Sequence, residues 1–548
     1  MKRIFISVLC LFAALAAGAQ TMYDAINFSE NNYSGSARTI GLGNAVTALG
    51  SDLGTIGINP AGSAVAGYSQ FTFSPSIVYS STDVVFTDVH YNDNDNNELI
   101  STINNSTSSR NRMALPNIAG TFVLNTGRNH GLKSMTFGLV SNTTNNWLDK
   151  FDATGGGNQT SMFGSIASYA QAMGYDPSIL ASSEGYDRYQ WKSVSAYQSG
   201  LIGDFGDKQY AAATEQILKD KDGNPYCITS GYLNRDYSRK VSGTKYDIVF
   251  NYAMNFSDKL FLGVNLGFPC GHYAFSENLT ETPAADDLSD FSFTYETGEE
   301  VSFQQGTNTY AYTADLSGIY AKVGVIWLPV AGLRVGAAVQ TPTLLEVTEH
   351  FQTSMYSLFN NSENRATSPQ GDYSYYIYAP WRYNVGAAYT IGRIGLVSAD
   401  YERVNYRNMR YDDIDDGYYT DSFADVNSEI KTYAGASNML RVGIEARPIS
   451  KLALRLGYAL TTKDTDFVDT KIQSFSFGAG YTSDSSFFCD FAVRGTQYPV
   501  YYNYPYDYYT TQEDSNESVV VIDDRFTVPE IKTTRSLFEF VATFGWRF

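Results

Sequence analysis

The last strand of the chain constrains the fold most. Residues 537–548 alternate strictly, with apolar, mostly aromatic side chains at every second position. This period of two is the spacing of a β-strand whose two faces meet different surroundings. In water, a terminal strand with such a face would be an aggregation hazard, whereas lipid is a suitable solvent for it. The apolar face carries Phe538, Phe540, Ala542, Phe544, Trp546 and Phe548.

Earlier segments repeat this alternation, at residues 260–268, 397–402, 451–460 and 474–481. Their second face carries mainly small, polar or charged residues, which suit a polar lumen better than the dry core of a sandwich. Aromatic residues make up 15% of the chain and charged residues only 17%, below the quarter that is usual in soluble domains. The sequence therefore predicts an all-β fold, a transmembrane antiparallel β-barrel.

The connections between the predicted strands alternate between short and long. Short ones lie near residues 127–131, 256–258, 329–332, 391–393, 448–451 and 483–486. Long polar ones lie near residues 91–112, 145–240, 277–306, 353–371, 411–435, 464–470 and 501–533. Short periplasmic turns and long extracellular loops are the outer-membrane arrangement, and these connections separate 14 strands. The longest connection, 145–240, has apolar residues at helical spacing between Met162 and Met173, which predicts a helix.

The first residues are typical of a secretory signal peptide. Lys2 and Arg3 precede an apolar run over residues 4–17, and the small residues 17–19 predict cleavage after Ala19. Without residues 1–19 the chain has 36 basic against 57 acidic residues, which argues against nucleic-acid binding. No later segment approaches the ~18 consecutive apolar residues of a transmembrane helix. We therefore expect the protein in the cell outer membrane, in contact with its lipid.

Residues 20–66 do not resemble strands. Residues 36–45 read SARTIGLGNA and residues 57–62 read GINPAG. The GLGNA sequence is no dinucleotide fingerprint, because no strand precedes it and Val46 replaces the third glycine. Repeated glycines permit tight turns and close approach of the backbone, as a compact plug inside a barrel requires. We expect residues 20–66 to form a hatch within the lumen of a barrel made of residues 67–548.

The motifs of this segment resemble those of the long-chain fatty acid transporter (FadL) family of outer-membrane proteins. The resemblance continues with APWR at residues 379–382 and with DY at residues 400–401, so it spans most of the mature chain. It implies a monomeric barrel of 14 strands, a hatch that fills the lumen, an apolar pocket beneath the external loops and a side opening in the wall. It also implies passive uptake of long-chain fatty acids or other hydrophobic small molecules.

The match to the family motif singles out Asn59, Pro60, Ala61 and Gly62 for hatch positioning and transport. Pro60 fixes its backbone angle, and Asn59 is able to hydrogen-bond the barrel wall. The alternative is a rigid turn that leads into the first strand of the barrel.

The C-terminus resembles the signal by which the barrel assembly machinery recognises outer-membrane proteins for insertion. The residues concerned are Phe544, Trp546 and Phe548. Elsewhere, four histidines are scattered without partners at metal-ligand spacing, and no catalytic motif is present. We therefore expect no enzyme activity, no cofactor and no metal site.

Four prolines fall within predicted strands, namely Pro75, Pro116, Pro269 and Pro342. Proline donates no ladder hydrogen bond, and a closed barrel has no edge strand to accommodate it. Each position therefore indicates a bulge, a kink or a displaced strand boundary, and each is a candidate for the lateral opening.

Other functions remain open at this point. Shuttle components of type IX protein secretion have a similar ARxxGLG start and NPAG motif, yet they deliver secreted cargo to a surface complex. An ordinary porin would conduct ions steadily, and the hatch-like segment counts against it. A soluble secreted β-protein would expose too much aromatic surface in its last strand.

Overall fold

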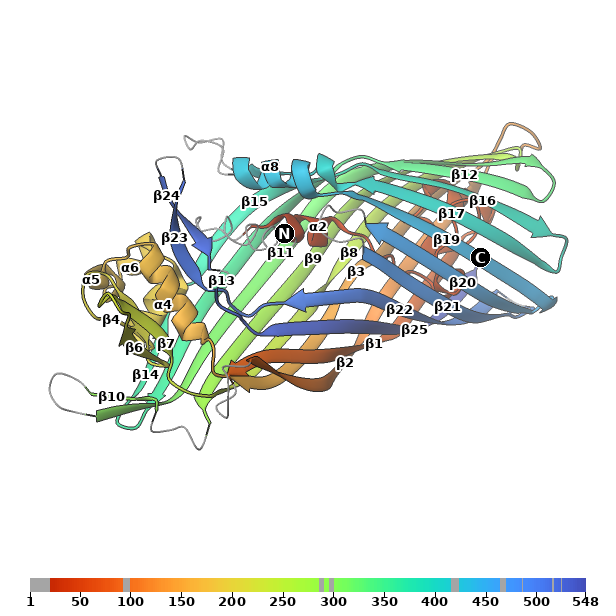
Figure 1. Ribbon diagram of the computed structural model, residues 1–548. Coiled ribbons are helices and arrows are strands. Elements are labelled where there is room, and N and C mark those ends of the chain that lie inside the picture. Colours follow the sequence, from red (N-terminus) through yellow and green to blue (C-terminus); the bar gives the residue numbers. More distant parts are fainter. Residues whose placement is uncertain are drawn as a thin grey trace.

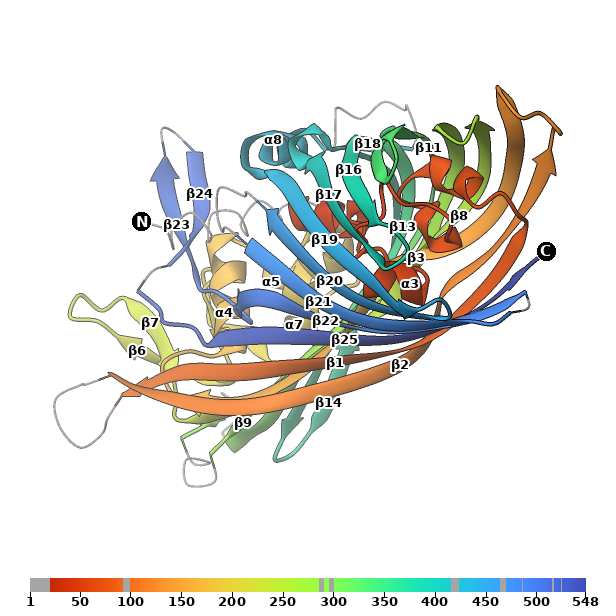
Figure 2. The same ribbon diagram turned by 90° about the vertical axis from the view of Figure 1, so that its right-hand side faces the viewer.

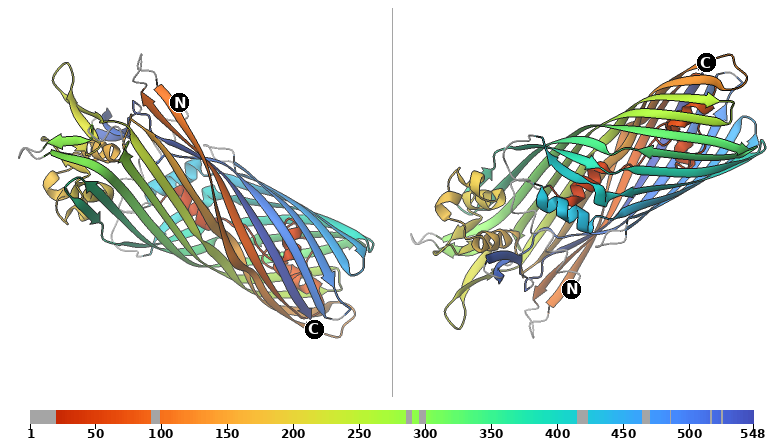
Figure 3. Two further views of the ribbon diagram at one scale, coloured as in Figure 1. Left: turned by 90° about the horizontal axis from the view of Figure 1, so that it is seen from below. Right: turned by 90° about the horizontal axis from the view of Figure 1, so that it is seen from above.

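The computed structural model describes residues 20–91, 99–284, 290–294, 300–414, 423–463, 470–484, 486–514, 517–523 and 525–548. The predicted signal peptide lies outside these residues. Among the helices that are described, none combines the length and the apolar character needed to cross a membrane. Strands dominate the structure, and they close into a single barrel (Figures 1 and 3).

The wall is antiparallel throughout and closes where its first strand meets its last. The first strand, β1 (Gln70–Tyr91), pairs with β2 (Leu99–Asn125) on one side and with β25 (Glu530–Arg547) on the other. The other wall strands are β3 (Leu132–Gly157), β8 (Leu233–Phe256), β9 (Leu260–Pro283), β11 (Glu300–Val330), β12 (Leu333–Gln340), β13 (Thr343–Phe359), β15 (Gly371–Ala379), β16 (Arg382–Ile391), β17 (Gly395–Asn405), β18 (Arg410–Asp413), β19 (Ala436–Ile449), β20 (Leu452–Lys463), β21 (Thr470–Thr482) and β22 (Phe487–Asn503).

Three neighbouring strands of the wall are each interrupted once. β12 and β13 both pair with β11 and are separated by Thr341 and Pro342. β15 and β16 are separated by Pro380 and Trp381, and β17 and β18 by the short helix η3 (Tyr406–Asn408). The prolines explain two of these breaks, because they lack the N–H that the ladder needs. With each interrupted strand counted once the barrel has 14 strands, which confirms the predicted number.

Alternate residues of the lower wall face outward and form an apolar belt. In β25, Phe538, Phe540 and Trp546 are exposed, whereas Glu539 and Thr543 between them are buried. β8, β9, β16, β17, β20 and β21 show the same alternation. The predicted orientation of these strands is thus confirmed. A closed barrel with such a belt spans the outer membrane, because the ladders between neighbouring strands satisfy most backbone groups of the belt.

One side of the wall is much taller than the other. The strands β1, β2, β3, β8, β9 and β11 have 22–31 residues, whereas β19, β20 and β21 have 12–14. The predicted loops at 91–112 and 145–240 were therefore wrong at their ends. Residues 99–112 belong to β2, and β3 continues to Gly157 before β8 starts at Leu233. Above the lipid the outer face of a strand no longer meets an apolar solvent, so the alternation of hydrophobicity between a lipid face and a lumen face disappears.

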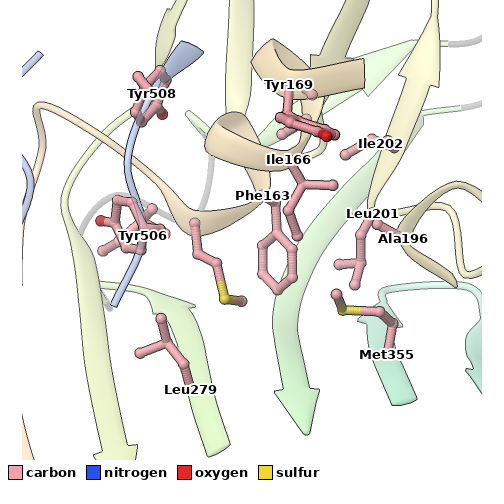
Figure 4. Close-up of a cluster of buried hydrophobic side chains, with 14 of the residues drawn as sticks. Phe163, Ile166, Tyr169, Ala196, Leu201, Ile202, Leu279, Met355, Tyr506 and Tyr508 are labelled. Atoms are coloured by element: carbon pink, nitrogen blue, oxygen red, sulfur yellow. The ribbon is translucent and has the colours of Figure 1, made fainter. Parts of the chain in front are cut away.

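An external cap, residues 158–232, packs against the tall side (Figure 1). Its predicted helix is confirmed as α4 (Met162–Ala172). Figure 4 shows Phe163 and Ile166 of this helix among side chains from the cap and the wall, including Leu279 of β9 and Met355 of β13. The rest of the cap consists of α5 (Pro177–Leu180), α6 (Gly185–Arg188), α7 (Trp191–Gln198), β4 (Ile202–Asp204), β5 (Tyr210–Ala212), β6 (Glu215–Lys219) and β7 (Pro225–Thr229).

The remaining elements lie in the connections between wall strands. Beside the cap, a hairpin follows β22, and the connection that leads into it carries Tyr506 and Tyr508, which pack into the core of the cap. A helix follows β18 and lies over the short side of the barrel (Figure 1). These elements are β10 (Ser292–Thr294), β14 (Glu363–Thr367), α8 (Ala424–Tyr433), β23 (Tyr509–Asp514) and β24 (Glu517–Ile522).

Candidate functional site

The N-terminal segment, residues 20–66, lies inside the barrel (Figure 2). It forms α2 (Met22–Ser29), α3 (Ala37–Gly41), η1 (Leu53–Thr55) and η2 (Pro60–Val65). Between residues 33 and 64, only Arg38 and Ser51 are not fully buried. The inward-facing side chains of the wall supply most of this burial, so the segment occupies the lumen where a hatch was expected.

Buried ion pairs hold the middle of the segment. Arg38 Nε lies 3.1 Å from Glu445 Oε2 on β19, and Arg455 Nε on β20 lies 2.8 Å from the same oxygen. Arg455 also pairs with Asp490 of β22. The Glu445 side chain is fully buried, so its charge is balanced by the arginines around it rather than by water. These contacts fix α3 to three strands of the wall.

A second group of cations surrounds the C-terminal end of α2. Lys245 Nζ of β8 donates to the carbonyl oxygens of Phe28 at 2.7 Å and Glu30 at 2.6 Å. Arg382 Nη2 of β16 donates to Ser29 O at 3.3 Å. Cations are favourable here, because the last carbonyls of a helix carry partial negative charge. Lys245 takes part in no ion pair among the described residues, and α2 itself supplies its acceptors.

The four predicted hatch residues come together against the wall. Asn59 Nδ2 donates to Thr47 O at 2.7 Å and to Val325 O of β11 at 3.1 Å, while its Oδ1 accepts from Ala61 N and caps η2. Pro60 is the first residue of η2, and its carbonyl accepts a bond from Asn251 Nδ2 of β8 at 3.0 Å. Asn59 and Pro60 thus form both the predicted contact with the wall and the alternative, a rigid turn. The role of these residues in transport stays a prediction.

Gly62 and two wall glycines make room for this packing. A Cβ on Gly62 would lie 2.6 Å from Thr55 Oγ1. A Cβ on Gly324 of β11 would lie 2.0 Å from Asn59 Oδ1, and one on Gly263 of β9 would lie 2.4 Å from the carbonyl carbon of Pro60. Sequence reasoning missed the wall glycines as partners of the segment. Their only signal was their place on the lumen face of alternating strands.

Farther out in the lumen, α2 fills an apolar chamber. Phe28 is fully buried, with its ring 5.5 Å from Tyr273 and 6.1 Å from Trp147. Helix α8 contributes Ile430 and Ala434 to the same cluster. We define the apolar chamber by the buried residues that contact α2 or line this cluster: Trp147, Ala314, Leu316, Leu345, Val347, Tyr375, Ile377, Val404, Tyr406, Met409, Tyr411, Phe423, Ile430 and Ala434.

The outer end of α2 is tied by hydrogen bonds to carboxylates. Gln20 Nε2 donates to Glu349 Oε2 of β13 at 2.9 Å, and Glu349 also accepts from two tyrosine hydroxyls of the chamber wall. Thr21 and Asp24 form a capping box at the start of the helix. Burial raises the pKa of Asp24 to about 6, against hydrogen bonds from Thr21 that lower it.

The barrel wall has a gap between β2 and β3. In the described parts of these strands, their ladder runs from Asn125 and Ser134 only as far as Asn117 and Asn142. Beyond that point β2 pairs with β1 alone, and β3 pairs with β8 alone (Figure 2). Farther out, the side chains of β2 residues 104–108 bond to β3 again, with Asn104 Nδ2 3.0 Å from Thr154 O. We call the opening between residues 109–116 and 143–151 the wall gap.

Two of the four prolines at which a strand distortion was predicted lie at this gap. The register of β1 against β2 shifts between Ser74 and Ser76, at the level of Pro75 and Pro116. Elsewhere, Pro342 separates β12 from β13, and Pro269 interrupts the pairing of β9 with β11. All four positions are therefore breaks or bulges in the ladder, and Pro75 and Pro116 accompany the opening of the wall.

The N-terminal segment also reaches the wall gap. Asn32 N donates to Thr144 O at 2.6 Å, and Ser34 forms an isolated β-bridge with Thr143. β3 bulges between Thr143 and Asn145, at the inner margin of the gap. One continuous stretch of chain therefore fills the apolar chamber with α2 and then pairs with the strand that borders the gap.

Other chemistry is sparse. In the described ranges, no group of three or more His, Cys, Asp or Glu side chains has the geometry to hold a metal ion. Cys227, Cys270 and Cys489 are free thiols.

No protein-family model and no curated protein matches the chain. Among solved structures, it is similar to the Pseudomonas putida toluene transporter TodX, at 12% identity and a TM-score of 0.46, over 94% of this chain and 98% of that one. The Ralstonia pickettii toluene transporter TbuX gives 14% identity and a TM-score of 0.43, over 94% and 99%. A Pseudomonas aeruginosa FadL homologue gives 12% and 0.46, over 93% and 98%. The last is described as a homologue of FadL, the family that the N-terminal motifs of this chain resemble.

Proposed function

We propose that this protein is an outer-membrane transporter for the passive uptake of hydrophobic compounds, long-chain fatty acids among them. The observation that carries the proposal is the path of residues 20–34. They fill the apolar chamber and also pair with β3 at the wall gap. Withdrawal of this stretch would open the chamber and loosen the margin of the gap together.

The physics of apolar solutes supports such a route. A dry site binds them by removing apolar area from water, at roughly 25 cal/mol per Å². The chamber is built of aromatic and aliphatic side chains, and α2 now covers them with Met22, Ala25, Ile26 and Phe28. A ligand that takes the place of these side chains recovers the same burial, so it competes with α2 on equal terms. Exit through the wall gap would then deliver it to lipid.

The cations at the inner end of α2 favour amphiphiles with an acidic head. If α2 leaves, Lys245 loses both of its carbonyl acceptors, and its ammonium group is left beside the chamber without them. A carboxylate is a stronger acceptor for an ammonium group than a neutral carbonyl. A fatty acid would therefore place its chain where Phe28 packs and its head where the carbonyls of Phe28 and Glu30 lie.

A disulfide between the segment and β3 tests the proposal. With Cys227, Cys270 and Cys489 changed to Ser, Asn32→Cys and Thr144→Cys would join residues that are already hydrogen-bonded. We expect the oxidised variant to take up radiolabelled hexadecanoic acid at the background rate, and a reductant to restore uptake. The two single-cysteine variants are the controls. Full uptake by the oxidised protein would refute the role of the segment.

A cargo shuttle of type IX secretion is the second candidate. The external hairpin of β6 and β7 carries Ile217, Tyr226 and Ile228, each more than a third exposed, as a protein-binding surface would. Mass spectrometry of material that remains bound after mild detergent extraction separates the two functions. Stoichiometric apolar small molecules support the transporter, whereas retained secreted polypeptides support the shuttle.

A further inference from the structure

Two arginines of β2 reach across the wall gap. Arg110 Nη1 donates to Val241 O at 3.1 Å, and Arg112 Nη2 donates to Gly243 O at 2.8 Å. Arg112 also donates to Asn146 Oδ1 of β3. Both backbone acceptors belong to β8, so the two side chains pass beyond β3, the strand that lies between β2 and β8 in the wall. They close the part of the gap where the ladder is missing.

These guanidinium groups have no counter-ion. All their acceptors are neutral, and no ion pair among the described residues includes either of them. Arg112 Nε is buried without a hydrogen-bond partner. The nearest carboxylates of β3 serve other groups, since Asp149 accepts from Thr82 and Asp152 pairs with Lys150.

In the lumen most arginines have a counter-ion, although Lys245, Lys322 and Arg334 also bind only neutral oxygens. There Arg38, Arg235, Arg382, Arg441 and Arg455 each pair with a carboxylate. Buried charges are as a rule paired, and this chain is strongly acidic, so carboxylates are in ample supply. Two adjacent cations that bind only neutral oxygens therefore form a site that lacks an anion.

The arginines lie at the outer rim of the apolar belt. Below them on β2, Met113 is 84% exposed and Phe122 59% exposed, and both are apolar. Beyond them toward the cap, the exposed residues of β2 are mostly polar, namely Asn104, Asn105, Ser106, Thr107 and Ser109, with Ile103 as an apolar exception. Membrane amphiphiles place their charged heads at such a boundary, with their chains in the belt.

The acceptor strand is shaped for this contact at Gly243. Its φ of +141° is a conformation that other residues rarely adopt, and an added Cβ would lie 2.0 Å from His272 O. Glycine alone fits there, in the middle of β8 and opposite Trp147 of β3. Gly243 keeps its place in both ladders of β8, opposite Trp147 and Tyr273, and its carbonyl accepts the bond from Arg112.

We propose that Arg110 and Arg112 form a latch on the wall gap that the anionic headgroup of an amphiphile releases. A carboxylate or a phosphate takes the place of the neutral oxygens and binds the guanidinium groups through paired, charge-assisted hydrogen bonds. β2 is then no longer tied to β8, and the gap widens where the amphiphile lies. This inference rests on the proposed function, and it adds selectivity for an acidic head at the exit.

Uptake of two amphiphiles that differ only in the head tests the latch. Radiolabelled hexadecanoic acid and hexadecan-1-ol would be supplied to cells that produce the wild type or the Arg110→Gln, Arg112→Gln double variant. Arg128→Gln, in an exposed periplasmic turn, is the matched control. We expect the double variant to lose about tenfold of its acid uptake, the scale of a charge-assisted hydrogen bond, and to keep or raise its alcohol uptake. The mobility of the unheated barrel in SDS gels checks folding.

A second arm identifies the source of the anion. Native mass spectrometry would compare binding of phosphorylated and dephosphorylated lipid A to the wild type and the double variant. If only acid uptake depends on the arginines, the head belongs to the transported compound. If only binding of phosphorylated lipid A depends on them, it belongs to the membrane lipid.

An equal change in acid and alcohol uptake, with no change in lipid binding, would overturn the latch. Failure of the wild type to take up either amphiphile above the background of empty cells would instead refute the proposed function. The two failures are therefore distinguishable.

Discussion

Two parts of the N-terminal segment, residues 20–66, are held by different forces. Around α3, Arg38 and its partners Glu445 and Arg455 form buried ion pairs. Around α2, Phe28 and its neighbours are held by apolar contact with the chamber. Ion pairs are specific to their partners and leave an uncompensated charge when broken, whereas apolar contact is non-directional and exchangeable. We therefore expect an apolar ligand to displace α2 and to leave α3 in place, so that only the first part of the segment moves.

Removal of the central carboxylate should have the largest effect. Glu445→Gln leaves Arg38 and Arg455 without their shared anion, and breaking a buried pair costs about 3–5 kcal/mol. Hydrogen exchange of backbone amides should become faster over residues 36–62 and stay unchanged over residues 22–29. Equal acceleration in both ranges would show that the segment responds as one body, and the comparison would fail.

A substitution in α2 should have the opposite pattern of effects, in α2 and not around α3. Phe28→Ala removes a fully buried ring, which typically costs about 3 kcal/mol or more. Exchange should become faster over residues 22–29 only, and hexadecanoic acid should bind more tightly, because less must be displaced. Tyr23→Ala is the control, since Tyr23 is 56% exposed. Weaker binding of the acid by the Phe28 variant would mean that α2 helps to form the site instead of covering it.

Substitutions of Asn59 test how residues 36–62 are held to the wall. Asn59→Asp keeps the acceptor that caps η2 but loses the two bonds donated to Thr47 O and Val325 O. Two unmade bonds at buried carbonyls should weaken local protection by about 1–3 kcal/mol. Asn59→Ala should cost more, since it also loses the cap. Equal exchange over residues 55–62 in the two variants would assign the whole role of Asn59 to the turn.

The smallest effect should be a pH dependence confined to α2. The pKa of Asp24 is raised from 3.8 to about 6 when α2 is docked, so docking favours the protonated carboxyl. This contribution is fully present below about pH 4 and is lost as the pH rises through about 6. Exchange over residues 22–29, corrected for intrinsic rates, should be slower at pH 5 than at pH 7. Asp24→Asn should abolish the difference, and a persistent difference would point to another group.

The sequence predicted the parts of the fold in which lipid and lumen act on alternate residues. The alternation of Phe540 and Glu539 in β25, and of Leu456 and Arg455 in β20, reports directly which face meets lipid. The taller ends of β2 and β3 were missed because no lipid contacts them. Their polar residues, such as Asn104, look the same in a strand as in a loop.

The candidate site was predicted only where it is local. The NPAG motif places Asn59 and Pro60 by their own spacing, and the prolines at 75 and 116 indicated a distortion of the wall. The partners of the segment come from strands far along the chain, as Glu445 does for Arg38, and nothing near either residue encodes the meeting. The wall gap is a stretch without ladder bonds, and apart from these two prolines no residue pattern marks its extent.

The seam of the barrel has a consequence for how the protein is made. β1 starts at Gln70, only a few residues after η2 ends at Val65, and it is β1 that meets β25 to complete the cylinder. The N-terminal segment is therefore joined to the strand that closes the barrel, while its ion-pair partner Glu445 belongs to the last quarter of the chain. During assembly, the C-terminal strands close around the N-terminal segment. We therefore expect the segment to act as a template for closure of the barrel, before any role in transport.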